Sequence, residues 1–91
     1  MADLFTPTQL QHVDPQNGQA FTAQEISALI GGIGGQIEQL DLENDGDDIV
    51  VFYRSGALLN PPVNVQAETL FGQEFLGNVL AMPPAQAPPQ P

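Results

Sequence analysis

The stretch Gln36–Tyr53, QIEQLDLENDGDDIVVFY, carries the strongest structural signal in this chain. Its first part alternates apolar and polar residues, with one slip in phase between Ile37 and Leu40, and its last five residues are β-branched or aromatic. Both patterns are typical of β-strands. The Asp45-Gly46 pair between them favours a tight turn. The stretch therefore predicts an antiparallel hairpin whose second strand lies centrally in a sheet.

The segment before this hairpin predicts the main helix of the fold, from Thr22 to about Ile30. Thr22 suits the N-cap position, and Glu25 follows three residues later, which is the spacing of a capping box. Four apolar residues then recur at helical spacing, so one face of the helix should pack on a core. These residues are Ile26, Leu29, Ile30 and Ile33.

A glycine-rich stretch, Gly31–Gln36 (GGIGGQ), invites comparison with a phosphate-binding loop. A dinucleotide fingerprint needs glycines at i, i+2 and i+5, between a strand and the helix that follows it. Counted from Gly32, the third position falls on Ile37, and these glycines follow the helix instead of preceding it. The C-terminus of a helix carries partial negative charge, which repels phosphate. We therefore expect the glycines to end the helix and to allow close backbone packing.

The predicted fold class is α+β, with one main helix (about 22–30) packed on a small, mainly antiparallel β-sheet. Leu10–Val13 and Phe75–Met82 are expected to be strands, and Ala57–Leu59 is expected to begin another short one. Val63–Phe71 is expected to be a loop with a short helical turn.

Residues 1–82 are expected to form a single small domain. The segment 83–91 holds five of the nine prolines, so we predict an extended polyproline II tail outside the core. Such a tail is either solvated or docked on a partner. The small size of the domain and its apolar strands also predict self-association through an exposed edge.

The charge of the chain excludes several function classes. Eleven acidic residues stand against one basic residue, Arg54, so the formal net charge is −10. Binding to DNA, RNA or anionic membranes requires clustered Lys or Arg, so we expect none of these. The chain has no cysteine, which excludes disulfides and Cys-based zinc sites. No stretch approaches the ~20 apolar residues of a membrane span, and the N-terminus lacks a signal-peptide pattern, so we expect a cytoplasmic protein, in the host cytoplasm if viral.

The acidic residues of the hairpin invite a calcium interpretation, which the spacing disfavours. An EF-hand loop closes with Glu at its twelfth position and lies between two helices. Counted from Asp41, the twelfth position is Phe52, and both flanks are predicted strands. We therefore expect a solvated hairpin tip and no dedicated metal site. The acidic residues are Asp41, Glu43, Asp45, Asp47 and Asp48.

The sequence contains no specific catalytic signature, so we predict no enzyme activity and no cofactor. His12 is the only histidine and has no second His or Cys for a zinc set. Ser27 lies within the predicted helix and Ser55 within a turn, so neither occupies a nucleophile elbow.

The most plausible ligand contacts surround the turn after the hairpin. Arg54 is expected either to pair with a nearby carboxylate or to grip a ligand anion. Tyr53, Asn60 and Asn64 flank the same turn and offer neutral hydrogen-bonding groups. These four residues are the predicted ligand-binding set.

Several motifs together resemble a family of short proteins of phages and plasmids, defined as a domain of unknown function. The resemblance covers about Phe21–Met82 and includes a helix that runs into G-G-x-I-E, a G-x-L turn, a P-P-x-N stretch and a final strand. Family members often carry an acidic residue and a lysine around the G-x-L turn, where Arg54 and Ala57 stand here. The motifs are Gly34-Gly35-Gln36-Ile37-Glu38, Gly56-Ala57-Leu58, Pro61-Pro62-Val63-Asn64 with Ala67, and Phe75-Leu76-Gly77-Asn78-Val79.

The resemblance implies a small, non-catalytic accessory binding protein of a mobile element. One hypothesis is an oligomer that sequesters a small nucleotide used as an immune signal. A second is a protein-interaction or structural component of a virion or complex, which uses the acidic face and the proline-rich tail. A third is a mimic of nucleic acid, which requires the acidic residues to lie along one face.

Overall fold

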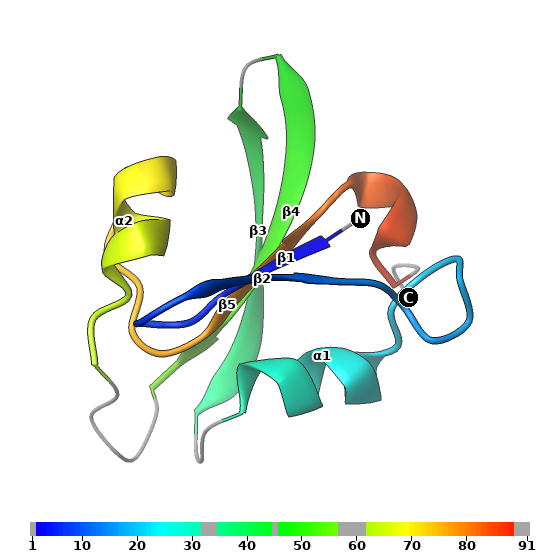
Figure 1. Cartoon of the computed structure of the whole chain (residues 1–91), viewed down its shortest axis with the longest axis horizontal. Coiled ribbons are helices and arrows are strands. Elements are labelled where there is room, and N and C mark those ends of the chain that lie inside the picture. The colour runs from blue at the N-terminus through cyan, green and yellow to red at the C-terminus, as the bar shows by residue number, and fades with distance from the viewer. Residues whose placement is uncertain (1, 32–34, 45, 57–61, 89–91) are drawn as a thin grey trace.

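The computed structural model describes residues 2–31, 35–44, 46–56 and 62–88 and has an α+β fold. Five strands form one antiparallel sheet in the order β2-β1-β5-β4-β3, and a helix lies on each side of it (Figure 1). The strands are β1 Ala2–Phe5, β2 Leu10–Val13, β3 Gln36–Asn44, β4 Asp47–Ser55 and β5 Val79–Met82. The helices are α1 Ala23–Ile30, α2 Val65–Phe71 and the 3-10 turn η1 Pro84–Gln86.

The predicted hairpin is confirmed. Strands β3 and β4 pair without interruption from Gln36↔Ser55 to Asn44↔Asp47. The expected strand Leu10–Val13 is also present, as β2. It pairs with β1, a four-residue strand that the sequence did not predict. So short a segment has no measurable periodicity, and β1 becomes recognisable only through its pairing with β2 and β5.

The centre of the sheet is buried on both faces, which explains the dense apolar run of β4. Val50 and Phe52 point to the face that carries α1, whereas Val51 and Tyr53 point to the face that carries α2. The slip in phase within β3 has the same cause, because Ile37 packs on the α1 side and Leu40 on the α2 side. Strict strand alternation is therefore preserved.

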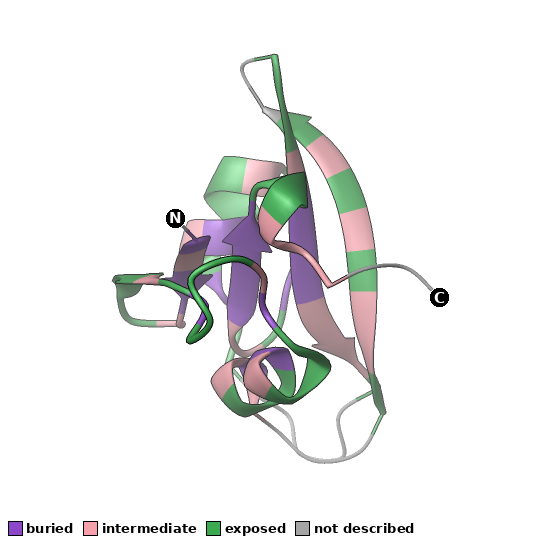
Figure 2. Cartoon of the chain, turned by 90° about the vertical axis from the view of Figure 1, so that its right-hand side faces the viewer, coloured by how far each residue is buried: buried purple, intermediate pink, exposed green. Residues whose placement is uncertain are grey.

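Each face has its own hydrophobic core, and Figure 2 shows the buried central strands between the two. The α1-side core contains Ala2, Leu4, Phe21, Ile26, Ile30, Val50, Phe52, Leu80 and Met82. The α2-side core contains Phe5, Val51, Ala67, Phe75, Val79 and Ala81. All four residues of β5 are buried, so this strand contributes to both cores.

The main helix begins with the predicted capping box. The Thr22 hydroxyl accepts a hydrogen bond from the Glu25 amide (3.1 Å), and the Thr22 amide donates to Glu25 Oε1 (3.0 Å). Glu25 Oε2 also accepts from the Gln16 amide (2.9 Å), which ties the preceding loop to the helix. These backbone donors, Gln16 first and then Thr22, lower the pKa of the Glu25 carboxyl.

The predicted role of the glycines is confirmed at two described positions, Gly31 and Gly35. Gly31 caps the C-terminus of α1 with a positive φ of 66°, and its amide donates to the Ser27 carbonyl. Gly35 (φ 60°) lies against the end of β4, where a Cβ atom would come within 1.8 Å of the Ser55 carbonyl oxygen. Residues 32–34 lie outside the described part of the chain.

The expectation of one main helix is corrected by α2, a seven-residue helix where a loop with a helical turn was expected. Only Ala67 of this helix is fully buried, so its sequence shows no helical apolar pattern. Its cover of the sheet depends on aromatic edge-to-face contacts near its end. Phe71 lies 5.6 Å from Phe5 and 6.1 Å from Phe75, centroid to centroid.

The final strand is shorter than expected, and the proline-rich segment lies on the domain. Strand β5 begins at Val79, since Leu76 forms only an isolated bridge with Val63. Beyond it, Pro83 and Ala87 have extended backbone angles, but the residues between them form η1. The Phe21 amide donates to the Gln86 carbonyl (2.8 Å), and Ala87 packs on the α1-side core. Gln86 and Ala87 therefore contact the domain itself.

Gly35→Ala should destabilise the fold more than Gly18→Ala, although both glycines have positive φ. Gly18 has open space where a Cβ would be added, so its substitution costs about 1 kcal/mol for backbone strain alone. At Gly35 the Cβ also meets backbone, and we expect a total of about 3 kcal/mol. Urea denaturation of both variants measures the difference, and equal costs would contradict the close approach of Gly35 to the end of β4.

Glu25→Gln should reduce stability at neutral pH and less so in acid. Because the folded-state pKa of Glu25 is lowered, its contribution is present above its ordinary value near 4.5 and is lost as pH falls through the folded pKa. Denaturation midpoints of the variant and the natural chain should therefore converge as the pH falls from 4.5 through the folded-state pKa. If the two plots of denaturation midpoint against pH stay parallel, the folded state does not stabilise the charged form of Glu25.

Candidate functional site

The structure does not bring the predicted ligand residues together. Tyr53 and Arg54 are neighbours on β4, so their side chains point to opposite faces of the sheet. The Tyr53 ring lies edge-on to Phe75, with centroids 5.2 Å apart, on the α2 side. Arg54 Nε donates to the Gly31 carbonyl (2.7 Å) at the end of α1. Asn60 lies outside the described residues.

Asn64, the fourth predicted residue, is fully buried and holds three parts of the chain together. Its Nδ2 group donates to the carbonyls of Phe5 and Gly77, both at 2.7 Å. Its Oδ1 accepts from the Ala67 amide (3.1 Å) and caps the N-terminus of α2. Both Nδ2 hydrogens and the Oδ1 oxygen are used within the fold, so Asn64 has a structural role here.

Arg54 has a structural role of the same kind at the C-terminus of α1. Asn78 Nδ2 donates to the Leu29 carbonyl (3.0 Å), so two side chains satisfy carbonyls at this helix end. A guanidinium group is also favoured there by the negative end of the helix dipole. Arg54 is the only basic residue of the chain, and this position explains its presence without a ligand.

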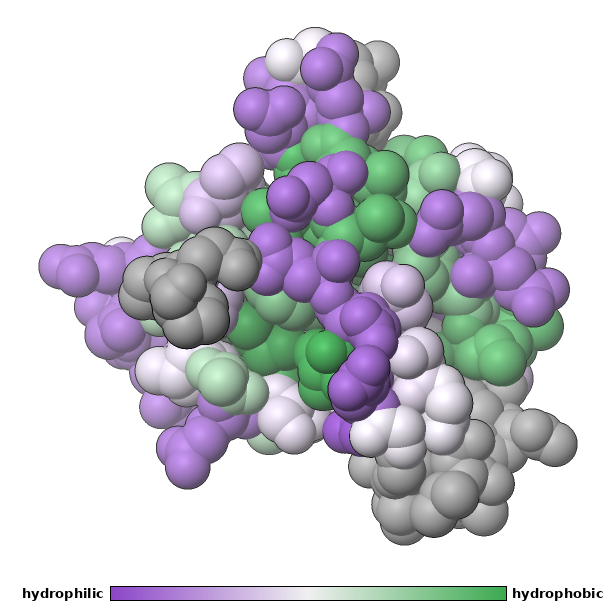
Figure 3. All heavy atoms as spheres, turned by 180° about the vertical axis from the view of Figure 1, so that it is seen from behind, coloured by the Kyte–Doolittle hydropathy of each residue, from purple (hydrophilic) through white to green (hydrophobic). Residues whose placement is uncertain are grey.

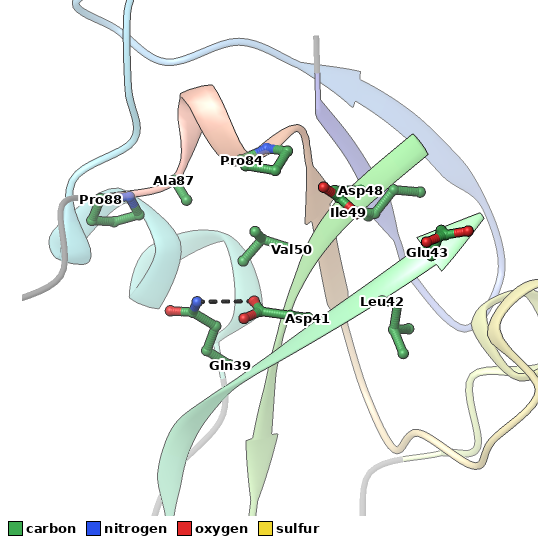
Figure 4. A pocket seen from close by; sticks show the side chains of 10 residues that line it. All are labelled: Gln39, Asp41, Leu42, Glu43, Asp48, Ile49, Val50, Pro84, Ala87 and Pro88. Atoms are coloured by element: carbon green, nitrogen blue, oxygen red, sulfur yellow. Dashed lines mark hydrogen bonds between the residues drawn. The ribbon is translucent and has the colours of Figure 1, made fainter. Parts of the chain in front are cut away.

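A different site emerges between the β3–β4 hairpin and the segment that carries η1. A groove of about 770 Å³ lies there, with residues of β3 and β4 on one side and the proline-rich segment on the other (Figure 4). It is lined by Gln39, Asp41, Leu42, Glu43, Asp48, Ile49, Val50, Pro84, Ala87 and Pro88.

Three exposed carboxylates and an apolar floor give the groove its chemistry. Glu43 and Asp48 are directly opposite each other across the β3–β4 ladder, and Asp41 is opposite Val50. Like charges in such a pair are unfavourable unless a cation lies between or beside them. Gln39 Nε2 donates to Asp41 Oδ1 (3.2 Å), which orients this carboxylate. The groove therefore combines negative charge with apolar contact surface.

The space-filling view from behind shows hydrophilic and hydrophobic surface side by side on one face of the molecule (Figure 3). Polar side chains form a band down the middle of the face, and apolar surface lies on both sides of the band. This distribution is expected for an edge strand such as β3, whose polar and partly buried apolar residues alternate.

Other chemical groups of the described chain do not assemble into a site. His12 Nδ1 lies 2.6 Å from Asp3 Oδ1, across the β1–β2 pair, and both side chains are exposed. Within 2–31, 35–44, 46–56 and 62–88, no three His, Cys, Asp or Glu residues are grouped to hold a metal ion. The acidic turn joins two strands, so the helix-loop-helix frame of an EF-hand is absent there.

No family model matches this chain, and no curated protein or solved structure shows significant similarity to it. Among the helices of the described residues, none combines the length and apolar character that crossing a membrane requires.

The sequence analysis identified the acidic hairpin and the proline-rich segment, but it did not predict that the two lie side by side and form a groove. The acidic hairpin and the proline-rich segment are separated by about thirty residues in the chain, and no local pattern connects them. Strand β5 brings the two together, because it pairs with β4 and ends at Met82, so the proline-rich segment begins next to β4.

Asn64→Ala should destabilise the protein by about 3 kcal/mol, because it leaves one buried carbonyl, one partly buried carbonyl and one helix N-terminal amide without this partner. Asn64→Asp keeps the cap acceptor but places a carboxylate oxygen toward two carbonyls, so it should cost at least as much. Asn17→Ala is the matched control. Asn17 Oδ1 also accepts two backbone hydrogen bonds, but at an exposed turn where water replaces it. Equal denaturation midpoints for Asn64→Ala and Asn17→Ala would contradict the structural role.

Proposed function

We propose that the protein is a non-catalytic cytoplasmic interaction module that binds a basic segment of a partner protein in the groove beside the β3–β4 hairpin. The observation that supports this most is the position of Asp41, Glu43 and Asp48 around an apolar floor. The net charge of −10 supports it further, because the field of the whole chain attracts a cationic partner.

Lys and Arg side chains fit both parts of this groove. Their methylene stems make favourable contact with apolar surface while the charged head reaches polar groups. Here Val50, Ala87 and the ring of Pro84 supply the apolar surface, and the carboxylates lie at its rim. An Arg head is able to bridge two carboxylate oxygens with paired hydrogen bonds, which adds geometric selectivity.

The nucleotide-sequestering hypothesis receives less support. A phosphate in the groove would face three carboxylates. Of the predicted nucleotide-binding residues that the structure describes, Tyr53 and Arg54 point to opposite faces and Asn64 is engaged in the fold. The nucleic-acid mimic requires acids along one face, whereas Glu38 and Asp41 of β3 project to opposite faces. Origin from a phage or other mobile element stays a prediction that rests on the resemblance of motifs.

An array of peptides in which Lys or Arg is interspersed with Val should contain binders, and their affinity should depend on the groove. The triple variant Asp41→Asn, Glu43→Gln, Asp48→Asn should bind roughly tenfold or more weakly, because exposed ion pairs contribute up to about 1 kcal/mol each. Titration calorimetry at low ionic strength measures the loss.

The matched control is Asp14→Asn, Glu68→Gln, Glu74→Gln, which removes the same charge from exposed positions outside the groove. It should retain most of the affinity. If the two triple variants lose affinity equally, the peptides respond to net charge alone, and the groove is not the binding site.

A further inference from the structure

Strand β3 forms an edge of the sheet and pairs with β4 on one side only, among the strands that the structure describes. At nine residues it is as long as β4 and more than twice as long as β2, the strand at the other edge. An edge strand presents backbone donors and acceptors that another extended chain is able to pair with. Length makes β3 the better template of the two edges.

Monomeric proteins usually protect a long edge with a bulge, a proline or a lysine. Strand β3 has none of these: its register with β4 is continuous, and its sequence QIEQLDLEN contains neither Pro nor Lys. Its protection consists of acidic residues, which repel a second acidic strand but attract a basic one. The edge of β3 therefore disfavours pairing with an acidic strand but permits pairing with a basic one.

The two faces of β3 also differ in chemistry. Gln39, Asp41 and Glu43 point to the α1 side, where they line the groove. Leu40 and Leu42 point to the α2 side, where they are only partly buried against the α2-side core. A strand added beside β3 would therefore extend the acidic face on the α1 side and the apolar face on the α2 side.

We propose that β3 binds its partner by strand addition, and that the partner segment alternates basic and apolar residues. This inference rests on the proposed function and specifies the chemistry of its partner. The basic residues lie beside Asp41 and Glu43, and the apolar residues cover Leu40 and Leu42. Main-chain hydrogen bonds supply affinity, whereas the alternation of side chains supplies selectivity. A second copy of this chain is a poorer occupant, because each copy carries a net charge of −10.

The test uses a capped peptide as long as β3 in which Lys and Val alternate. A block peptide of the same composition, with all Lys before all Val, is its matched control. Two further peptides carry N-methyl groups on every Lys nitrogen or on every Val nitrogen. In an added strand only alternate amides face β3, so one methylated version should lose binding and the other should keep it.

We expect the block peptide to bind roughly tenfold or more weakly than the alternating peptide. One methylated version should weaken similarly, while the other binds within about twofold of its parent. Alternate backbone amides of β3 should gain protection from hydrogen exchange when the alternating peptide is bound, and those of β2 should not.

Strand addition is overturned if the block and alternating peptides bind equally, or if both methylated versions behave alike. In that case the groove triple variant (Asp41→Asn, Glu43→Gln, Asp48→Asn) is compared with the control triple variant. If peptide affinity falls only in the groove variant, the proposed function stands and only strand addition is wrong. If neither the block nor the alternating peptide binds the natural chain at low ionic strength, both proposals are wrong. If alternate β3 amides gain protection as the protein concentration is raised without peptide, the occupant is instead a second copy of the chain.

Discussion

Burial of β4 and β5 on both faces is the constraint on which the rest of this structure depends. A chain of 91 residues must cover both sides of its central strands, and it does so with two helices of eight and seven residues. Helices this short are marginal on their own, because few residues share the cost of nucleation. Their ends are therefore held by specific side chains: Thr22 and Glu25 at the start of α1, Arg54 and Asn78 at its end, and Asn64 at the start of α2.

This constraint determines which polar residues remain for function. Asn64 and Arg54 have the chemistry of ligand-binding residues, but both are engaged with backbone carbonyls that would otherwise lack partners. The outer half of the β3–β4 hairpin extends past the two helices (Figure 1), and its exposed carboxylates belong to neither core. The proline-rich segment adds an apolar wall beside it. A surface with these two properties suits a basic, extended partner.

The features predictable from sequence are those encoded by neighbouring residues. The hairpin, the capping box at Thr22 and the helix stop at Gly31 each depend on contacts within a few residues, and each is confirmed. Strand β1 and helix α2 escaped prediction because β1 exists through pairing with distant strands and α2 through a buried Asn64. The groove escaped for the same reason, since η1 reaches Val50 only through the pairing of β5 with β4. Sequence proximity made Tyr53 and Arg54 look like one site, whereas strand alternation separates them.

The central claim, that α1 and α2 cover opposite faces of one sheet, is tested most directly by nuclear Overhauser contacts between side-chain protons. The account predicts contacts between the rings of Tyr53 and Phe75 and between those of Phe5 and Phe71, which lie on the α2 side. It also predicts contacts from Arg54 to Gly31, on the α1 side. Contacts from the Tyr53 ring to Ile26 or Ile30 of α1 would contradict it, because they would place both helices on a single face and leave the groove without its frame.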